Sequence, residues 1–357
     1  MNMPFSPETF FVRILNQDDP NEFARIDMFV GSHDQGTAFH RPAWVTSVSK
    51  ACGHDWCYLM AENAEGELQA ILPLSLIHSA LFGRALVSSG FAVGGGILSV
   101  TDQATQMLTD AVWSFAETYS FPSVELRGGP VADDKWQKKH GVYAGFVTDL
   151  AQDDESQLLS IPRKQRAEVR KGLKNDLEVR VGSNRQDLSD HYDVYAESVH
   201  NLGTPVFPKA LFESVIDAFG ADADILTVSN SGKPVASVLS LYHKGTVLPY
   251  WGGGTFDARR LRANDVMYYA LMNHARKRGC ERFDFGRSKI GTGAYAFKKN
   301  WGFEPEPLSY AIRTADGEEA RDVNPMSPKY RLQVFLWQKL PLSLANRLGP
   351  IIAKGLG

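Results

Sequence analysis

The alternation of apolar and polar residues predicts a first half that is rich in strands and contains one long helix. Apolar runs at 56–62 and 68–79, separated by a polar segment that contains a glycine, predict a hairpin of two strands. A third strand is predicted at 84–93. Apolar residues recur at intervals of three and four between 102 and 119, which predicts an amphipathic helix before a short strand at 123–129.

The second half repeats this order of elements. Three strands, a helix and a closing strand are predicted at 223–230, 235–245, 246–254, 264–278 and 282–288. Gly94–Gly96 and Gly128 recur as Gly252–Gly254 and Gly286, at one constant offset of 158 residues. The pattern indicates a duplicated unit, and chance agreement of turn glycines on a common order of elements is the alternative.

A duplication of this kind predicts an α/β (α+β) protein with two tandem domains, each a mixed sheet flanked by helices. The length of 357 residues fits two domains of about 150 residues each. We expect the domains at 1–150 and 151–322, followed by a basic amphipathic C-terminal tail at 323–357. The second domain is expected to carry the active cleft, because the first copy of the glycine triplet lacks a neighbouring aromatic pair.

Composition narrows the classes of function. The 38 Lys and Arg residues are balanced by 41 Asp and Glu residues, for a net charge of −3, so no general basic field is available to bind double-stranded nucleic acid. Three cysteines favour free thiols in a reducing compartment over a disulfide framework. No apolar stretch approaches the roughly 20 residues of a membrane-spanning helix, so a cytoplasmic protein is expected.

Two segments contain residues suited to anion binding. Arg163, Arg166 and Arg170 follow Pro162 at helical spacing and share a face, which could hold phosphates or could be a solvated helix surface. In the strand 246–254, the pair Tyr250-Trp251 precedes Gly252, Gly253 and Gly254, whose backbone can approach a ligand closely. A bulge or bend at the end of a strand is the structural alternative for this triplet.

The segment 283–303 is the richest in chemistry. Asp284 alternates with two phenylalanines on a strand, and Arg287, Ser288 and Lys289 follow where the strand ends. Tyr295, Lys298 and Lys299 come next, at i, i+3 and i+4 of a predicted short helix that ends before Gly302. Because ligands bind beyond the ends of strands in open α/β sheets, we expect a binding site here, with a surface ion pair between Asp284 and Arg287 as the alternative.

Two further features are weaker. The residue types of Cys52, His54 and Cys57 suit a metal, but only three are present, so no metal site is predicted. The tail 323–357 contains five cations and no acid, interleaved with apolar residues and divided by Pro341 and Pro350. This pattern is typical of a segment at a membrane interface, and a C-terminal helix packed across the two domains is the alternative.

Several of these segments together resemble the FemAB family. They occur in order along nearly the whole chain and include TAFHRPAW, IPRKQRAEVRKG, VHNLGTPVFP, LPYWGGG and FDFGRSKIGTGAYAFKKNWGFEP. Within that family the sequence is most similar to the FemAB-like proteins associated with the exosortase (PEP-CTERM) and exopolysaccharide systems of bacteria. The resemblance implies two tandem GNAT-like acyltransferase domains.

The resemblance also implies a reaction: transfer of an acyl or aminoacyl group to an amine on a sugar or cell-envelope precursor. Acyl-CoA or aminoacyl-tRNA would be the cosubstrate, and no tightly bound cofactor is expected. In GNAT-like domains a splayed pair of central strands holds the acyl carbonyl against backbone N–H groups, and by position the strands ending in YWGGG and FDFGRS are that pair. The pyrophosphate-binding pattern lacks both its glycines in the segment Arg259 to Asn264, which argues against ordinary acetyl-CoA binding.

Roles follow for the residues named above. Asp284 is expected to accept the proton of the attacking amine, and Lys298 and Tyr295 complete the catalytic set. Lys298 is also expected to bind phosphates, together with Lys299, Arg287 and Lys289. The expected substrate-binding residues are Tyr250, Trp251, Gly252, Gly253, Gly254, Asn264, Arg287, Ser288, Lys289, Lys299, Arg163, Arg166 and Arg170.

Two other functions stay open. One is a peptidyltransferase that uses aminoacyl-tRNA, although no heptad segment for the coiled-coil arm of such relatives is present. The other is a non-catalytic scaffold that binds glycan precursors. In each case we expect a cytoplasmic protein with peripheral contact at the inner face of an anionic membrane through its tail.

Overall fold

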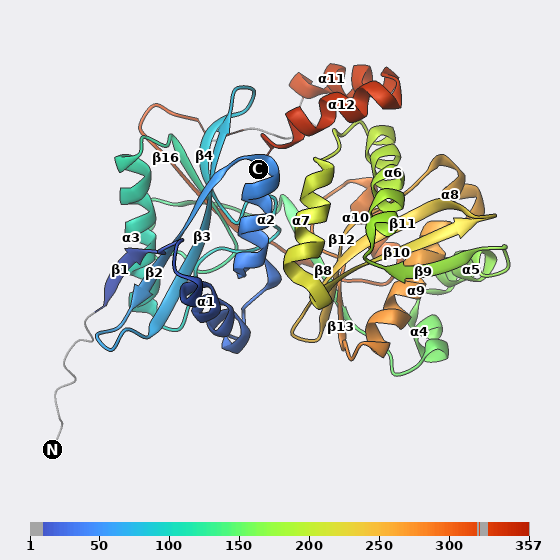
Figure 1. Cartoon of the computed structure of the whole chain (residues 1–357), viewed down its shortest axis with the longest axis horizontal. Coiled ribbons are helices and arrows are strands. Elements are labelled where there is room, and N and C mark those ends of the chain that lie inside the picture. The colour runs from blue at the N-terminus through green and yellow to red at the C-terminus, as the bar shows by residue number, and fades with distance from the viewer. Residues whose placement is uncertain (1–9, 320, 322–327, 357) are drawn as a thin grey trace. The chain divides into compact units, whose positions relative to one another are not determined.

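The computed structural model describes residues 10–319, 321 and 328–356 (Figure 1). The first nine residues, the start of the predicted tail and the last residue lie outside the described residues. Within them the chain forms two compact units, each with its own mixed sheet. The first unit contains the chain up to residue 139 and residues 309–321, and the second contains residues 140–308 and the C-terminal helices.

The first unit is a sheet with helices packed on it. Its strands are β1 (Phe11–Ile14), β2 (Asp55–Glu62), β3 (Leu68–Ser79), β4 (Gly83–Ser88), β5 (Leu98–Ser99), β6 (Ser123–Arg127), β7 (Gln137–Lys139) and β16 (Tyr310–Thr314). They are ordered β1-β2-β3-β4-β6-β16-β7, with β5 paired to β3. Its helices are α1 (Pro20–Ser32), η1 (Ala38–His40), α2 (Pro42–Cys52) and α3 (Asp102–Thr118).

The predicted hairpin and helix of this unit are confirmed. The helix α3 begins where the side chain of Thr101 accepts a hydrogen bond from the Ala104 N–H. Its residues Leu108, Val112 and Ala116, at intervals of four, are fully buried and form the core with the sheet.

The second unit has the same architecture with more helices. Its strands are β8 (Tyr143–Asp149), β9 (Glu178–Gly182), β10 (Ala223–Asn230), β11 (Lys233–His243), β12 (Thr246–Gly254), β13 (Arg282–Asp284), β14 (Ser288–Lys289) and β15 (Pro305–Pro307). They are ordered β14-β8-β13-β12-β11-β10-β9, with β15 paired to β8. Its helices are α4 (Asp154–Ser160), α5 (Arg163–Gly172), α6 (Arg185–Asn201), α7 (Lys209–Phe219), η2 (Gly220–Asp222), α8 (Phe256–Leu261), α9 (Ala263–Lys277), α10 (Gly293–Asn300), α11 (Pro328–Lys339) and α12 (Leu342–Ala353).

Helices cover both faces of the second sheet. Trp251 of β12 packs on Phe212 of α7, with ring centroids 5.0 Å apart. The next residue, Gly252, faces the opposite side, where it meets Tyr268 of α9. Because successive residues of a strand point to opposite faces, α6 and α7 lie on one face and α9 lies on the other.

The duplication predicted from the glycines is visible in the strand pairing. Each otherwise antiparallel sheet contains one parallel pair, formed by the strands before and after its main helix: β4 with β6, and β12 with β13. Gly128 and Gly286 both adopt a left-handed conformation within two residues of the end of the second strand of the pair, with φ of 74° and 67°. The two units therefore share their central plan.

The two units exchange one strand each. Although β8 follows β7 in the chain, it pairs with β13, β14 and β15 of the second unit. Conversely, β16 pairs with β6 and β7 of the first unit. The exchange places residues 140–149 in the second unit and 309–321 in the first, whereas the sequence predicts boundaries at 150 and 322. The apolar pattern of a strand shows which of its faces is buried but not which distant strand it pairs with, so the sequence does not reveal this exchange.

The described part of the predicted tail forms the helices α11 and α12, which pack on α6. Ala345, Gly349 and Ala353 of α12 are buried at intervals of four, and Gly349 lies against Val206. The helices are separated at Pro341, but Pro350 does not divide the segment, because α12 continues through it to Ala353 without the one hydrogen bond that its missing N–H would make.

Candidate active site

The two central strands of the second unit separate after a short parallel contact. The contact between β12 and β13 is limited to Thr246 with Arg282 and Val247 with Phe283. Further along β12, Leu239 of β11 is paired with Trp251 and Ser240 with Pro249, so that Tyr250 is an extra residue in a bulge. A bulge bends its strand, and β12 continues to Gly254 paired with β11 alone. In the described structure the β13 side of this last segment has no partner strand, and we call this opening the strand gap.

The residues packed around the glycine triplet at the edge of the gap leave no room for side chains at its positions. A Cβ on Gly253 would lie 2.3 Å from the hydroxyl of Ser198, and a Cβ on Gly254 would lie 2.5 Å from Oδ1 of Asn264. Both distances are too short for any larger residue without displacement of α6 or α9. The triplet therefore lets two helices approach β12 closely, which leaves its backbone as the surface that borders the gap.

In the first unit, the equivalent segment is hydrogen-bonded to the backbone that follows the second strand of the parallel pair. Gly96, which corresponds to Gly254 in the duplication, donates a backbone hydrogen bond of 3.0 Å to the carbonyl of Arg127. A Cβ on Gly96 would lie 1.8 Å from the carbonyl oxygen of Gly128, so the two segments are in direct contact. The second unit has no equivalent backbone contact among its described residues, because the pairing of β12 with β13 ends at Val247 and Phe283.

Asp284 ends β13 at the gap. Its carboxylate accepts a hydrogen bond of 2.7 Å from the backbone N–H of Gly286. Burial raises the pKa of Asp284, whereas this hydrogen bond and the charge of Lys298 lower it. A carboxylate whose pKa is raised by burial is a better proton acceptor than one in water, as the predicted role requires.

Lys298 of α10 is held by backbone oxygens of the loop after β13. Its Nζ donates hydrogen bonds of 3.1 Å to the carbonyl of Gly286 and 3.0 Å to that of Arg287. It also lies over the rings of Phe146 and Phe285, at 5.4 and 5.7 Å from their centroids. Burial lowers the pKa of Lys298 to about 8, against the opposing effect of Asp284. The Lys298 ammonium therefore binds the backbone of the loop after β13, a structural role that the sequence does not reveal.

The remaining residues of the segment are placed around α10. The ring of Tyr295 packs edge-on against Phe146 at 5.4 Å, and the guanidinium of Arg287 lies 4.6 Å from the ring centroid of Tyr143. The carbonyl of Lys289 accepts a hydrogen bond of 2.7 Å from Thr292, whose own side chain caps α10. Ser288 is buried, and its Oγ has no hydrogen-bond partner among the described residues. Lys299 is exposed.

Asn264 lies in the turn that replaces the glycine pattern. Arg262, between α8 and α9, adopts the left-handed conformation with φ of 57°, which glycine would adopt more easily. Its guanidinium pairs with Glu168 of α5 at 2.5 Å. The turn is therefore formed without glycine, and Oδ1 of the buried Asn264 amide beside Gly254 has no partner among the described residues.

The arginines of α5 are not brought to the strand gap by its packing. Gln165, Val169 and Gly172 are buried and face α9, and Gln165 donates a hydrogen bond of 2.5 Å to Asp265. Arg163 and Arg170 lie on the opposite, exposed face of α5. Arg166 donates a hydrogen bond of 2.8 Å to the carbonyl of Leu159. The face is a solvent-exposed basic surface, as the structural alternative in the sequence predicts.

The aromatic pair of β12 is divided between two environments. Trp251 is 4% exposed and packs among Phe207 and Phe212, so it belongs to the core on the α7 side. Tyr250, the bulge residue, is half-buried. The sequence places both rings in the cleft, but the alternation of the strand directs Trp251 into the core.

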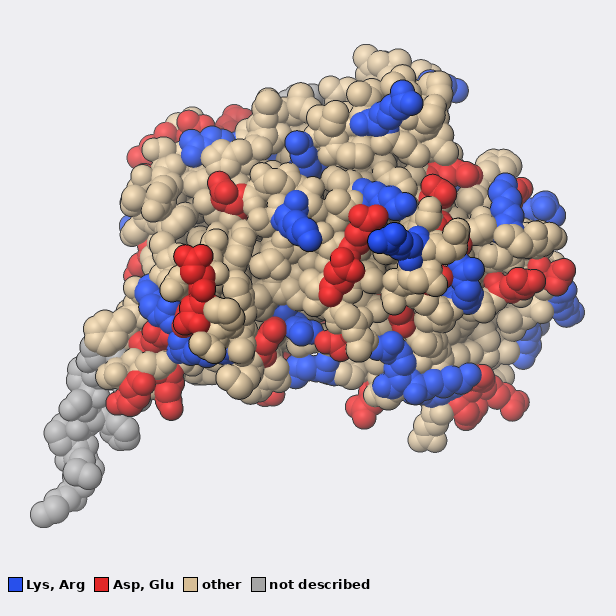
Figure 2. Space-filling view, viewed as in Figure 1, with Lys and Arg blue, Asp and Glu red and all other residues tan. Residues whose placement is uncertain are grey.

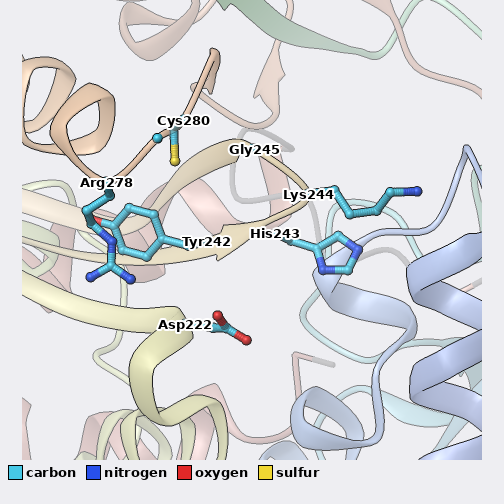
Figure 3. Close-up of a pocket in the computed structure, with 8 residues that line it drawn as sticks. Asp222, Tyr242, His243, Lys244, Gly245, Arg278 and Cys280 are labelled. Carbon is cyan, nitrogen blue, oxygen red and sulfur yellow. The ribbon is translucent and has the colours of Figure 1, made fainter.

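A second hollow of about 240 Å³ lies where β11 turns into β12, beyond the opposite end of β12 from the glycine triplet. Figure 3 shows the Arg278 guanidinium beside the ring of Tyr242, which are 3.8 Å apart, and Lys244 extended away from them. Tyr242, His274 and Arg278 all contact the buried carboxylate of Asp224, at 2.8, 2.7 and 3.1 Å. Burial raises the pKa of the Cys280 thiol. These groups tie the end of α9 to the sheet and offer no reactive nucleophile.

The described residues contain neither a cluster of metal-ligating side chains nor a helix that could span a membrane. Over 10–319, 321 and 328–356, no three His, Cys, Asp or Glu side chains are placed to hold a metal ion. Nor does any helix in this part of the chain combine the length and apolar character needed to cross a membrane.

Comparisons with known proteins agree with this geometry. The family model for the acetyltransferase (GNAT) domain matches residues 163–299, which include β12, β13 and α10. No curated protein matches the sequence. The solved structure of FemX has a TM-score of 0.65 and 16% identity, over 83% of this chain and 96% of FemX.

Two other solved structures share the architecture. A tandem GNAT protein from the clavulanic acid biosynthesis pathway has a TM-score of 0.55 and 11% identity, over 87% of this chain and all of that protein (100%). L-PGS from Bacillus licheniformis has a TM-score of 0.51 and 12% identity, over 85% of this chain and 98% of that one. Such low identities establish the fold alone, so the expected tandem GNAT-like architecture is confirmed.

Proposed function

We propose that the second unit transfers an acyl or aminoacyl group to an amine on a sugar or another cell-envelope or exopolysaccharide precursor. The observation that carries this proposal is the strand gap, an unpaired backbone edge that begins beside the half-buried carboxylate of Asp284. The match to the acetyltransferase domain over the same residues supports an acyltransferase. The more specific link to exosortase and PEP-CTERM systems rests on the sequence resemblance.

The proposed reaction needs few side chains. The nitrogen of a neutral amine attacks the carbonyl carbon of the donor, so that a C–N bond forms and the C–S bond of a thioester, or the C–O bond of an aminoacyl ester, breaks. Asp284 accepts the proton that the amine loses, and the leaving thiol or hydroxyl takes up a proton. Backbone N–H groups of β12 bind the carbonyl oxygen, and holding the two substrates together supplies much of the acceleration.

Acyl-CoA is the first candidate donor, and binding tests it. A ligand present at 100 times its Kd stabilises the folded protein by about 2.7 kcal/mol, which is easily seen in a thermal-shift experiment. We expect the unfolding temperature to rise with acetyl-CoA or a longer acyl-CoA, and to rise equally in the Asp284→Asn variant. A shift with a UDP-N-acetyl sugar or charged tRNA alone would contradict a CoA donor.

Aminoacyl-tRNA is the second candidate donor. The exposed arginines of α5 favour it, because a solvated basic surface can contact a phosphate backbone without a pocket. Elsewhere the charges are mixed: Figure 2 shows Lys and Arg interspersed with Asp and Glu on the face in view. An activity in cell extract that is abolished by RNase would identify tRNA as the donor.

We also propose that α11 and α12 hold the protein at an anionic membrane. Leu344, Leu348 and Ile351 of α12 are 41%, 39% and 62% exposed, and they lie on one face at intervals of four and three. Arg347 and Lys354 border this face on one side. Apolar residues flanked by cations, without an acid, are suited to a surface of anionic lipid.

Vesicle binding tests this contact. We expect the wild-type protein to sediment with vesicles that contain anionic lipid at low salt, and to be released as salt rises. The double variant Leu348→Glu/Ile351→Glu should lose binding without loss of stability, since both side chains are exposed. Leu159→Glu is the matched control, because Leu159 of α4 is 52% exposed in the same unit. Equal binding by all three proteins would argue against the proposal.

A further inference from the structure

Tyr268 of α9 reaches both strands that border the gap. A Cβ built on Gly252 would lie 3.1 Å from the Tyr268 hydroxyl oxygen, so the phenol lies directly against the glycine edge of β12. Its ring packs edge-on against Phe285, the residue after Asp284, with the centroids 4.7 Å apart. The rings of Phe297 and Trp301 at 5.7 and 6.2 Å complete its surroundings. Four elements therefore fix the position of this hydroxyl.

The Tyr268 hydroxyl has no hydrogen-bond partner among the described residues, although the residue is half-buried. Two neighbouring tyrosines of the second unit do have one: Tyr242 donates to Asp224 at 2.8 Å, and Tyr269 donates to the carbonyl of Asp154 at 2.8 Å. A phenol in protein normally finds a partner, because an unmade hydrogen bond is unfavourable. A fixed, unpartnered donor beside an unpaired strand edge is therefore arranged for a ligand atom that accepts a hydrogen bond.

We propose that Tyr268 donates a hydrogen bond to the carbonyl oxygen of the acyl group that lies in the strand gap. This inference rests on the proposed acyl transfer and adds a residue to its site. When the amine nitrogen forms its bond to the carbonyl carbon, the π electrons of the C=O bond move to the oxygen. The phenol stabilises that negative charge without giving up its proton. The C=O bond then re-forms, and the thiolate or alkoxide leaves with the bonding electrons and takes up a proton.

The electrostatics of the site suit this role. Burial raises the pKa of Tyr268 to about 12, so the phenol keeps its proton throughout the neutral range. The cation of Lys298 is held by the carbonyls of Gly286 and Arg287, and no bond between it and the Tyr268 hydroxyl is present among the described residues. Asp284 is left to accept the amine proton. Both candidate donors present a carbonyl oxygen, so the role is the same for a thioester and for an aminoacyl ester.

The variant Tyr268→Phe removes only the hydroxyl, and Tyr269→Phe is its matched control on the next residue. Removal of one oxyanion donor typically lowers kcat by about 10²–10³-fold. We expect a loss of this size in Tyr268→Phe, with unchanged KM for both substrates, unchanged pH profile and unchanged unfolding temperature. In Tyr269→Phe the rate should be unchanged and the unfolding temperature lower, because the bond to Asp154 is lost.

The assay uses the full chain with acetyl-CoA, a long-chain acyl-CoA and aminoacyl-tRNA as donors and an amino sugar as acceptor. If Tyr268→Phe transfers as fast as the wild type, the assignment of Tyr268 is overturned while the proposed function stands. If its loss of rate is matched by an equal loss in stability, the hydroxyl is structural and the assignment is also overturned. A wild-type protein that transfers from none of the donors overturns both.

Discussion

Replacement of Asp284 by Asn is expected to lower the rate of acyl transfer by about 10²–10⁴-fold, the usual contribution of a general base. The amide keeps the shape of the carboxylate and its oxygen can still accept the hydrogen bond from Gly286, which is 2.7 Å long in the wild type. It cannot accept the proton of the amine. The measurement is kcat at saturating substrates, with Asp217→Asn on the exposed surface of α7 as the control.

The same substitution should not lower stability. Burial raises the pKa of Asp284 in the folded protein, so the folded state binds this proton more tightly than the unfolded state does. The contribution of Asp284 to stability is thus favourable below its unfolded pKa and is lost as pH rises through the folded pKa. At neutral pH the neutral amide avoids this penalty, and an unfolding temperature equal to or above that of the wild type is expected. A variant that is both fully active and unchanged in stability would remove Asp284 from the mechanism.

Replacement of Lys298 by Met is expected to lower activity. The ammonium lowers the pKa of Asp284, and a nearby opposite charge typically does so by about 1–3 units. Without it the carboxylate is ionised only at higher pH, so the acid limb of the rate profile should move to higher pH and the rate on that limb should fall. The methionine keeps the apolar contact with Phe146 and Phe285, and measurement of kcat against pH shows the shift.

The pH profile separates this role from phosphate binding, which the sequence predicts for Lys298. Since the pKa of Lys298 is about 8, the ammonium is lost above that pH, and the rates of the wild type and of Lys298→Met should converge there. Lys233→Ala, at a side chain that is 72% exposed, is the control for loss of one positive charge. A rise in KM for the donor at every pH, with the acid limb unmoved, would favour phosphate binding instead.

The amino-acid sequence alone determined the elements and the repeat. Periods of two and of three to four residues predicted the hairpin of β2 and β3 and the helices α3 and α9 to within a residue or two, because these patterns reflect which side of an element is buried. The glycine landmarks predicted the duplication, since Gly128 and Gly286 adopt the same left-handed turn. The residue types and spacing of the segment 283–303 indicated the place where Asp284 and Lys298 lie close enough for their charges to interact.

Only the tertiary structure decided how the two copies of the repeated elements differ in their contacts. The two glycine triplets match in sequence, yet Gly96 closes its unit by a hydrogen bond to Arg127, while Gly252–Gly254 border an opening. The exchange of β8 and β16, the carbonyl partners of Lys298 and the place of Tyr268 beside Gly252 were also not predicted. Local sequence patterns show which side of a helix or strand is buried, because that depends on residues close together in the chain. Strand partners and hydrogen-bond partners are set by residues far apart in the chain, and they come together only when the whole sheet has formed.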